Sequence, residues 1–164
     1  MTTKTIIKAS AAPKSAASAH DAIALLKADH EAVDHLFAEY TKTRSAANKK
    51  SLIAEICTAL SVHAQIEEEI FYPAVKAALK DHVLVPEAIV EQASCKELIA
   101  QLEAADSIDE MVDAKVKVLS EFIKHHVKEE HTEMFRKAKA SSLDMIELGA
   151  RLAARKADLM TAKA

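Results

Sequence analysis

The chain has 164 residues, of which half are hydrophobic, one is glycine, three are proline and none is tryptophan. So few turn-forming residues favour long helices and exclude a sheet protein with many turns. Lysine and arginine number 22 against 25 acidic residues, and the net charge is −3. This balance excludes the strongly basic surface of a nucleic-acid-binding protein and a polybasic membrane patch, so we expect neither partner.

Segments that would direct the chain to a membrane or export it are not evident. No apolar run approaches the roughly 20 residues of a membrane span, and the first 19 residues lack the continuous apolar core of a signal peptide. Cys57 and Cys95 both lie in helical patterns, and two cysteines do not make a disulfide framework. We therefore expect a cytoplasmic protein with reduced thiols.

Composition along the chain divides it into three parts. Residues 1–18 are rich in serine, alanine and lysine and contain Pro13, which predicts a flexible N-terminal arm. Residues 19–141 carry four helical patterns, and residues 142–164 carry a shorter one, predicted as a C-terminal helix packed on or extending the others. Gly149 interrupts this last pattern, so the sequence leaves open whether it is one unbroken helix.

The first two helices each carry a polar residue within an apolar stripe. Ser18 or Asp21 can cap a first helix whose pattern fades after Thr41. Its stripe is Ile23, Leu26, His30, Val33 and Phe37. A second helix is predicted over residues 48–78, with the stripe Leu52, Ile56, Leu60, His63, Glu67, Ile70 and Phe71. Pro73 lies well inside it, so we expect a kink there.

The third and fourth helices repeat this design. The third is predicted over residues 86–104, and its stripe is Ala88, Gln92, Cys95, Leu98, Ile99 and Leu102. The fourth is predicted over residues 108–139, and its stripe is Met111, Val112, Lys115, Val118, Leu119, Phe122, His126, Glu130 and Met134. Lys115 is the one irregularity, which we attribute to drift of the register near the helix end.

Two His-x-x-x-Glu pairs lie on apolar stripes. Residues four apart share one helix face, so His63 and Glu67 point in the same direction, as do His126 and Glu130. An ionised carboxylate on an apolar face is costly unless it is paired or holds a cation. The pattern therefore indicates a buried metal site, with a buried His–Glu hydrogen-bond network as the alternative.

An internal repeat places the polar residues at one level. His63 matches His126 at an offset of 63, and His30 matches Gln92 at an offset of 62. A two-helix unit used twice predicts an all-α, up-down-up-down four-helix bundle with a pseudo-two-fold axis. The residues gathered around that axis are His30, His63, Glu67, Gln92, His126 and Glu130. Imidazoles and carboxylates without a thiolate suit iron, manganese or zinc, and two carboxylates on the axis can each bridge a pair of ions.

Several stretches of the chain resemble the hemerythrin-like HHE cation-binding proteins. The stretches are Asp29-His30, His63-Ala-Gln-Ile-Glu67-Glu-Glu-Ile-Phe71-Tyr72-Pro73, Lys96-Glu97-Leu98-Ile99 and His125-His126-Val-Lys-Glu-Glu130. The resemblance covers about residues 20–160. It implies a four-helix bundle around a non-haem di-iron centre. By the same resemblance His30 and His63 bind one iron, His126 binds the other, and Glu67 and Glu130 bridge the two.

The chain departs from the family at position 92. The repeat and the family pattern both call for histidine there, and the residue is Gln92, a weaker ligand. An asymmetric di-iron site, a single metal on the His30/His63 side, and a substitute ligand all remain open. The candidate substitutes are Cys95, one turn away, and Tyr72, if a kink at Pro73 turns it inward, but core packing is the favoured interpretation for both.

The remaining histidines carry no such signal. His35, His125 and His131 lie off the stripes and are predicted at the surface, and neither His20 nor His82 has a placement that suggests chemistry.

The leading functional hypothesis is a non-haem iron protein that binds a small oxidant, namely oxygen, peroxide or nitric oxide. The alternatives are an enzyme that processes peroxide or nitric oxide, and a metal-dependent redox sensor or interaction module. A proton donor near an open metal position would favour the enzyme. The sequence does not decide which metal is loaded, which small molecule binds, or whether the chain forms a homodimer through its C-terminal helix.

Overall fold

The computed structural model describes residues 21–164, so the predicted arm at residues 1–18 and His20 lie outside the described residues. Every regular element within 21–164 is helical. The elements are α1 (Ala22–Lys42), α2 (Ala46–Ile66), η1 (Glu67–Phe71), α3 (Tyr72–Leu79), α4 (Leu84–Glu103), α5 (Glu110–Glu129), η2 (Glu130–Met134), α6 (Phe135–Lys139) and α7 (Met145–Lys163). The elements η1 and η2 are π-helical turns.

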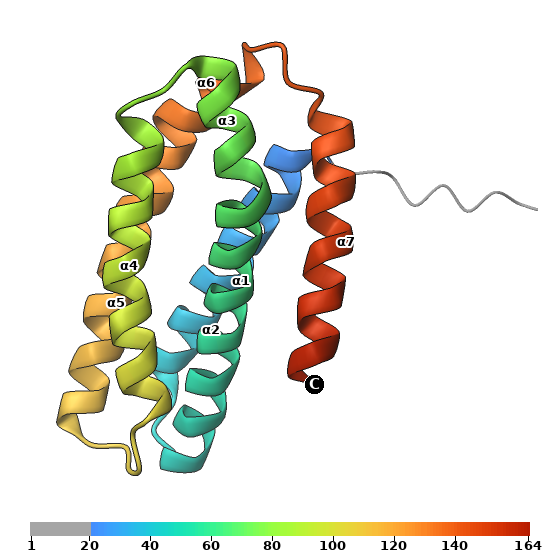
Figure 1. The fold of residues 1–164 in the computed structure, drawn as a ribbon. Coiled ribbons are helices and arrows are strands. Elements are labelled where there is room, and N and C mark those ends of the chain that lie inside the picture. Colours follow the sequence, from blue (N-terminus) through green and yellow to red (C-terminus); the bar gives the residue numbers. More distant parts are fainter. Residues whose placement is uncertain (1–20) are drawn as a thin grey trace, which may run out of the picture.

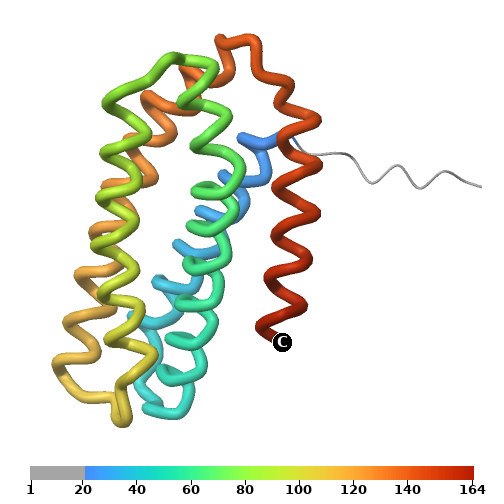
Figure 2. The backbone as a smooth tube through the Cα atoms, viewed as in Figure 1, coloured from blue at the N-terminus to red at the C-terminus, as the bar shows by residue number. Residues whose placement is uncertain are grey.

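These elements form four antiparallel rods and one added helix (Figure 1). The rods are α1, the continuous run α2–η1–α3, α4, and the continuous run α5–η2–α6. Rod α1 packs against α2 and α5, and α4 packs against α2 and α5, which closes the ring of four. The predicted up-down-up-down bundle with a C-terminal helix is therefore confirmed, and Figure 2 shows the chain path that connects the rods.

Capping residues in the sequence determine where the helices begin. The Asp21 carboxylate accepts a hydrogen bond from the Ala24 N–H at 2.7 Å and starts α1. Asp109 starts α5 in the same way, and Asp144 starts α7. These side chains satisfy main-chain N–H groups that have no partner within the helix.

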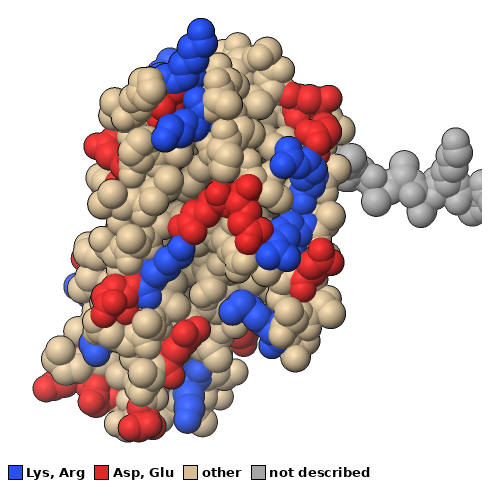
Figure 3. All heavy atoms as spheres, in the orientation of Figure 1, with Lys and Arg blue, Asp and Glu red and all other residues tan. Residues whose placement is uncertain are grey.

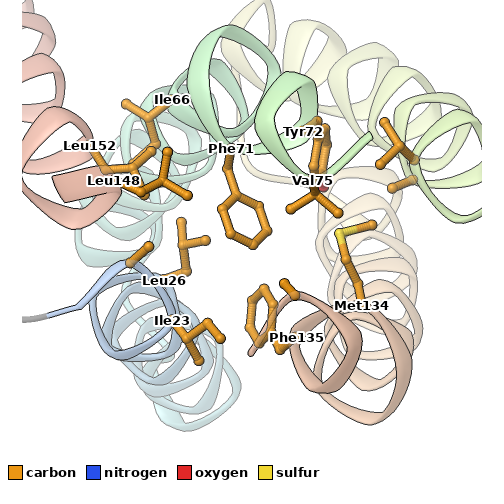
Figure 4. Packing of buried hydrophobic residues seen from close by; sticks show 14 residues of the cluster. Ile23, Leu26, Ile66, Phe71, Tyr72, Val75, Met134, Phe135, Leu148 and Leu152 are labelled. Carbon is orange, nitrogen blue, oxygen red and sulfur yellow. The ribbon is translucent and has the colours of Figure 1, made fainter. Parts of the chain in front are cut away.

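The bundle interior consists of two apolar clusters with a polar layer between them. One cluster contains residues from the start of α1, from the ends of η1 and η2 and the helices that follow them, and from α7. Figure 4 shows Phe71, Phe135 and Met134 converging in it. The other cluster fills the opposite end of the bundle, at the bottom of Figure 1, and is called the lower apolar cluster below. Along α1 the order is Leu26, His30, Val33, so a histidine lies where the two clusters meet. The apolar clusters thus place a polar residue between them, excluded from water.

The fourth stripe differs from its prediction. Met111, Val118 and Phe122 are 59%, 39% and 44% exposed, whereas Val116 is buried. The inward face of α5 runs through Val112, Val116 and Leu119, residues spaced four and three apart. The irregularity at Lys115 therefore came from taking Lys115 in place of Val116 and not from drift of the register, whereas Val112 and Leu119 are buried as predicted.

A π-helical turn begins six residues before Pro73, the position where a kink was predicted. In η1 the Tyr72 N–H bonds to the carbonyl of Glu67 instead of that of residue 68. The same geometry recurs in η2, where the Phe135 N–H bonds to the carbonyl of Glu130. Because no proline follows in the second copy, Pro73 is not the cause of the turn. The two turns begin at positions that the repeat relates, at an offset of 63.

Helix α7 is one unbroken helix that lies outside the ring, against α1 and α2. Gly149 is buried within it, so the missing side chain is compatible with close packing at this contact. Two ion pairs flank the contact, Arg155 with Glu69 at 2.7 Å and Lys156 with Asp29. Figure 3 shows acidic and basic side chains interspersed over this face of the molecule. None of the described helices is long and apolar enough to cross a membrane.

Apolar packing of α7 is expected to contribute to stability. Leu152 is fully buried in the cluster that α7 shares with the bundle, whereas Ile146 on the same helix is 54% exposed. Leu152→Ala should lower the free energy of unfolding by about 2–5 kcal/mol, because it leaves a cavity. Ile146→Ala should change it by less than about 0.5 kcal/mol. Urea denaturation of both variants measures the difference, and equal effects would show that α7 is not part of the cooperative core.

Candidate metal centre

The polar layer contains the residues that the repeat predicts at the bundle axis. All six are at most 8% exposed, and they come from all four rods. They are His30, His63, Glu67, Gln92, His126 and Glu130. The structure therefore brings together every predicted site residue, including the one at which the chain departs from the family pattern.

On one side of the layer two imidazoles converge. Nε2 of His30 lies 2.9 Å from Nε2 of His63, so two nitrogen lone-pair positions face one point. Oε1 of Glu67 lies 3.1 Å from Nε2 of His63, and Oε1 of Glu130 lies 3.6 Å from Nε2 of His30. One ligand atom from each of these four residues lies within 4.8 Å of every other. Imidazole nitrogens and carboxylate oxygens at such spacing form a ligand set for a first-row transition metal.

On the other side a phenol lies among the expected ligands. The Tyr72 hydroxyl lies 3.2 Å from Nε2 of His126 and donates to Oε2 of Glu67 at 3.0 Å. The Gln92 amide nitrogen donates to the Tyr72 oxygen at 2.9 Å and also to Glu67. Tyr72 therefore occupies the position beside His126 and Gln92 that a substitute ligand requires. Cys95 instead packs in the lower apolar cluster, where burial raises the pKa of its thiol to about 11.

The π-helical turn explains the inward placement of Tyr72. In a regular helix, a residue five positions after Glu67 points about 140° away from it. The extra residue in η1 removes most of this difference, so Glu67 and Tyr72 face the same interior and share a hydrogen bond. In the second copy, Phe135 follows Glu130 by the same five positions across η2, and the Phe135 ring stacks on His30.

Each of the three histidines has a partner for its second ring nitrogen. Nδ1 of His63 donates to Asp29 at 3.1 Å, and Nδ1 of His126 donates to Glu91 at 2.6 Å. Such partners orient a ligand imidazole and leave Nε2 free to bind a metal. Asp29 and Glu91 immediately precede His30 and Gln92, so both belong to the repeat, at an offset of 62. This acidic residue before each first-helix ligand is the sequence signal that could have identified both partners.

The partner of His30 is a histidine that was predicted at the surface. His131 is partly buried, and its Nε2 lies 2.8 Å from Nδ1 of His30. The surface placement therefore holds only in part, because one ring nitrogen of His131 faces inward to His30 on α1. His35 and His125 are exposed as predicted, and His82 is exposed as well.

The two carboxylates differ in charge state because they lie close together in a buried layer. Burial raises the pKa of Glu67, but the positive charge and hydrogen bond of His63 outweigh it and lower the pKa to about 2. Burial and repulsion by Glu67 raise the pKa of Glu130 to about 7. The metal-free layer thus holds one firmly ionised carboxylate and one that titrates near neutrality.

The imidazoles also differ. Burial, together with the charge of His63, lowers the pKa of His30 to about 3. Burial lowers the pKa of His63 as well, but Glu67 and the hydrogen bond with Asp29 outweigh it and raise the pKa to about 10. For His126 the hydrogen bond and charge of Glu130 likewise outweigh burial, and its pKa is about 9. Without a metal, His63 and His126 therefore hold the protons that balance the buried carboxylates.

Unpaired buried atoms test whether a metal fits this layer. Among the described residues Oε2 of Glu130 and Oε1 of Gln92 have no partner, whereas Oε1 of Glu67 and Oε1 of Glu130 meet only imidazole nitrogens, of His63 at 3.1 Å and of His126 at 2.9 Å. Leaving such atoms buried without partners is costly. A cation would satisfy the carboxylate oxygens directly, and half a turn of the Gln92 amide would offer its oxygen as a ligand. The residues present therefore fit a metal centre.

Comparison with known proteins places this geometry in a family. A model of the hemerythrin HHE cation-binding domain matches residues 21–138. The chain belongs to this family. Its fold resembles the crystal structure of a hemerythrin HHE cation-binding domain-containing protein from Mycobacterium kansasii, with a TM-score of 0.75 over 87% of this chain and 89% of that one. The two sequences are 22% identical, so this likeness shows the fold alone.

One relative matches this chain over only part of the relative's own length. A protein named DNA nickase from Nostoc sp. (strain PCC 7120 / SAG 25.82 / UTEX 2576) is 29% identical over 112 residues, which is 68% of this chain. The match covers 31% of the nickase, so the chain spans about a third of that relative. Together with the cluster of histidines and glutamates, membership of the family indicates metal binding by this chain.

Metal binding is expected to release protons and to strengthen as the pH rises. His63 and His126 have pKa values of about 10 and 9, so both hold a proton at pH 7 that the metal must displace. Loading with Zn²⁺ at pH 7 should release at least two protons per chain, since Glu130, with a pKa of about 7, also holds part of a proton there, and the affinity should increase from pH 6 towards pH 9. Calorimetry in buffers of different ionisation enthalpy counts the protons. Binding without proton release would contradict the assignment of these two nitrogens.

Proposed function

We propose that the polar layer holds a non-haem di-iron centre and that the protein acts on a small oxidant, namely oxygen, peroxide or nitric oxide. The observation that carries the proposal is the convergence of three imidazoles and two carboxylates in a layer excluded from water, where Oε2 of Glu130 has no hydrogen-bond partner among the described residues. Iron bound there would supply reversible one-electron chemistry and open coordination positions for such molecules.

The residues would share the centre asymmetrically. His30 and His63 would hold one iron, His126 would hold the other, and Glu67 with Glu130 would lie between the two. Each imidazole would be oriented through its Nδ1 atom, His63 by Asp29, His126 by Glu91 and His30 by His131. Gln92 offers a weaker ligand than histidine, and we propose that Tyr72 compensates for it, because its hydroxyl lies 3.2 Å from Nε2 of His126.

Tyr72 favours an enzyme over a reversible carrier. Burial and the charges of Glu67 and Glu130 raise the pKa of its hydroxyl well above the usual value, so without a metal it keeps its proton. A neutral phenol at the centre can donate a proton to a bound oxidant, or it can lose that proton and bind iron. Either role suits the processing of peroxide or nitric oxide.

A cavity reaches the other side of the centre. It lies between α1 and α5, has a volume of about 270 Å³, and has His30 and His131 among its lining residues. Phe37, Ile123 and Val127 supply apolar walls. A small uncharged molecule can enter such a cavity at little desolvation cost, so the cavity offers a route for the oxidant towards the His30 side.

Metal content tests the proposal directly. Purified metal-free chain loaded anaerobically with Fe²⁺ and desalted should retain about two iron ions per chain. Glu130→Gln should retain markedly less iron, because it removes a charged ligand from both ions. His35→Ala, which changes an exposed histidine of α1, should match the wild type. Elemental analysis gives the stoichiometry. If the wild type retained no metal with its helical content intact, the polar layer would be a hydrogen-bond network instead.

The role of Tyr72 has a spectroscopic signature. If its phenolate binds ferric iron, air oxidation of the loaded protein should produce a visible charge-transfer band from phenolate to iron. Tyr72→Phe should remove this band while the iron content stays close to that of the wild type. Tyr40→Phe changes another buried tyrosine, in the lower apolar cluster, and should keep the band. A band that persists in Tyr72→Phe would leave the phenol as a proton donor alone.

A further inference from the structure

A second group of metal-ligand side chains lies at the surface beside the buried centre. Nε2 of His125 lies 3.3 Å from Oε1 of Glu91 and 3.3 Å from Oε1 of Glu129. His125 and Glu129 are four residues apart on α5, and Glu91 reaches them from α4. Their three ligand atoms lie within 4.8 Å of one another. One imidazole and two carboxylates, held by two different helices, are the ligands that divalent first-row transition metals accept.

This group is accessible from solvent, unlike the centre below it. The side chains of His125 and Glu129 are 64% and 48% exposed, and that of Glu91 is 24% exposed. Glu91 also connects the two levels, because its Oε2 accepts the hydrogen bond from Nδ1 of His126 while its Oε1 faces His125. One carboxylate therefore touches both the surface group and a ligand of the buried centre.

A crevice between α4 and α5 leads from this group inward. Glu87, Glu91 and Glu129 line it, and so do His126 and Glu130 of the buried layer. Its volume is about 20 Å³, which is room for one water molecule or one ion. Glu130 is 2% exposed; its Oε1 lies 2.9 Å from Nε2 of His126, and its Oε2 has no hydrogen-bond partner among the described residues. A buried carboxylate oxygen without a partner thus lies along a narrow crevice that three further glutamates line, together with the apolar Leu84, Ala88 and Met134.

We infer that Glu91, His125 and Glu129 form a surface site for a divalent transition-metal ion and that the ion passes from it through the crevice to the buried centre. The inference rests on the proposed buried centre, which is the destination of the ion. The four carboxylates that line the crevice, beside its apolar residues, would replace the water that the ion loses. The surface site must bind weakly enough to release the ion inward.

The rate of metal uptake tests the passage. Metal-free chain is mixed with Co²⁺, samples are quenched with excess EDTA at successive times, and the cobalt retained after desalting is measured by elemental analysis. The double variant His125→Gln/Glu129→Gln removes two of the three surface ligands and none of the buried ones. Its uptake should be at least about tenfold slower than that of the wild type, with the same final occupancy, since losing ligating groups weakens binding by this order.

The matched control is His35→Gln/Glu39→Gln. It removes a histidine and a glutamate at the same four-residue spacing on α1, where His35 is exposed. Its uptake should match the wild type, which excludes a general effect of surface charge. Equal uptake rates in all three proteins would overturn the inference while leaving the buried centre in place. A wild type that retains no Co²⁺ would instead refute the buried centre, and the passage with it.

A second measurement isolates the surface site at equilibrium. After the buried centre has been filled with Co²⁺ and the protein desalted, titration with Zn²⁺ should detect one further, weaker site in the wild type and in the control. This site should be absent from His125→Gln/Glu129→Gln. Its persistence in that variant would show that these residues do not bind the ion.

Discussion

Two carboxylates buried side by side are the constraint on which the rest of this structure depends. Glu67 and Glu130 are at most 2% exposed and lie between two apolar clusters. Taking them out of water is costly unless positive charge accompanies them. In the metal-free protein His63 and His126 supply that charge as protonated imidazoles. A cation would take over this role, so the folding of the bundle and its affinity for metal depend on the same groups.

The π-helical turns connect the local backbone to this layer. Each turn begins at one of the two glutamates and shifts the helix register by one residue. The shift brings the side chain five positions later, Tyr72 or Phe135, over the same interior as the glutamate. Turns of this kind weaken regular helical hydrogen bonding, and they often occur at functional sites. Here the turns supply an aromatic side chain to each half of the centre.

The two halves are alike in backbone and different in chemistry. Tyr72 and Gln92 accompany His126 in one half, whereas Phe135 stacks on His30 in the other. A cavity reaches the His30 half, and the acidic crevice reaches the His126 half. Gln92, where the chain departs from the symmetry of the repeat, therefore has Tyr72 as its neighbour in the same half of the layer. In the proposed function, this pairing would make the centre asymmetric instead of two equivalent metal positions.

The amino-acid sequence by itself determined the four-helix bundle, the repeat and the six polar residues at its axis, because helical periodicity assigns each side chain to a face. Periodicity assumes 3.6 residues per turn, so it failed wherever the π-helical turns changed the register. For that reason only the tertiary structure decided that Tyr72 lies beside His126. The contact of His131 with His30 was decided there too, because packing brings the two helices together. Contacts between helices distant in sequence, such as Glu91 with both His125 and His126, were also decided there, since packing rather than spacing brings α4 against α5.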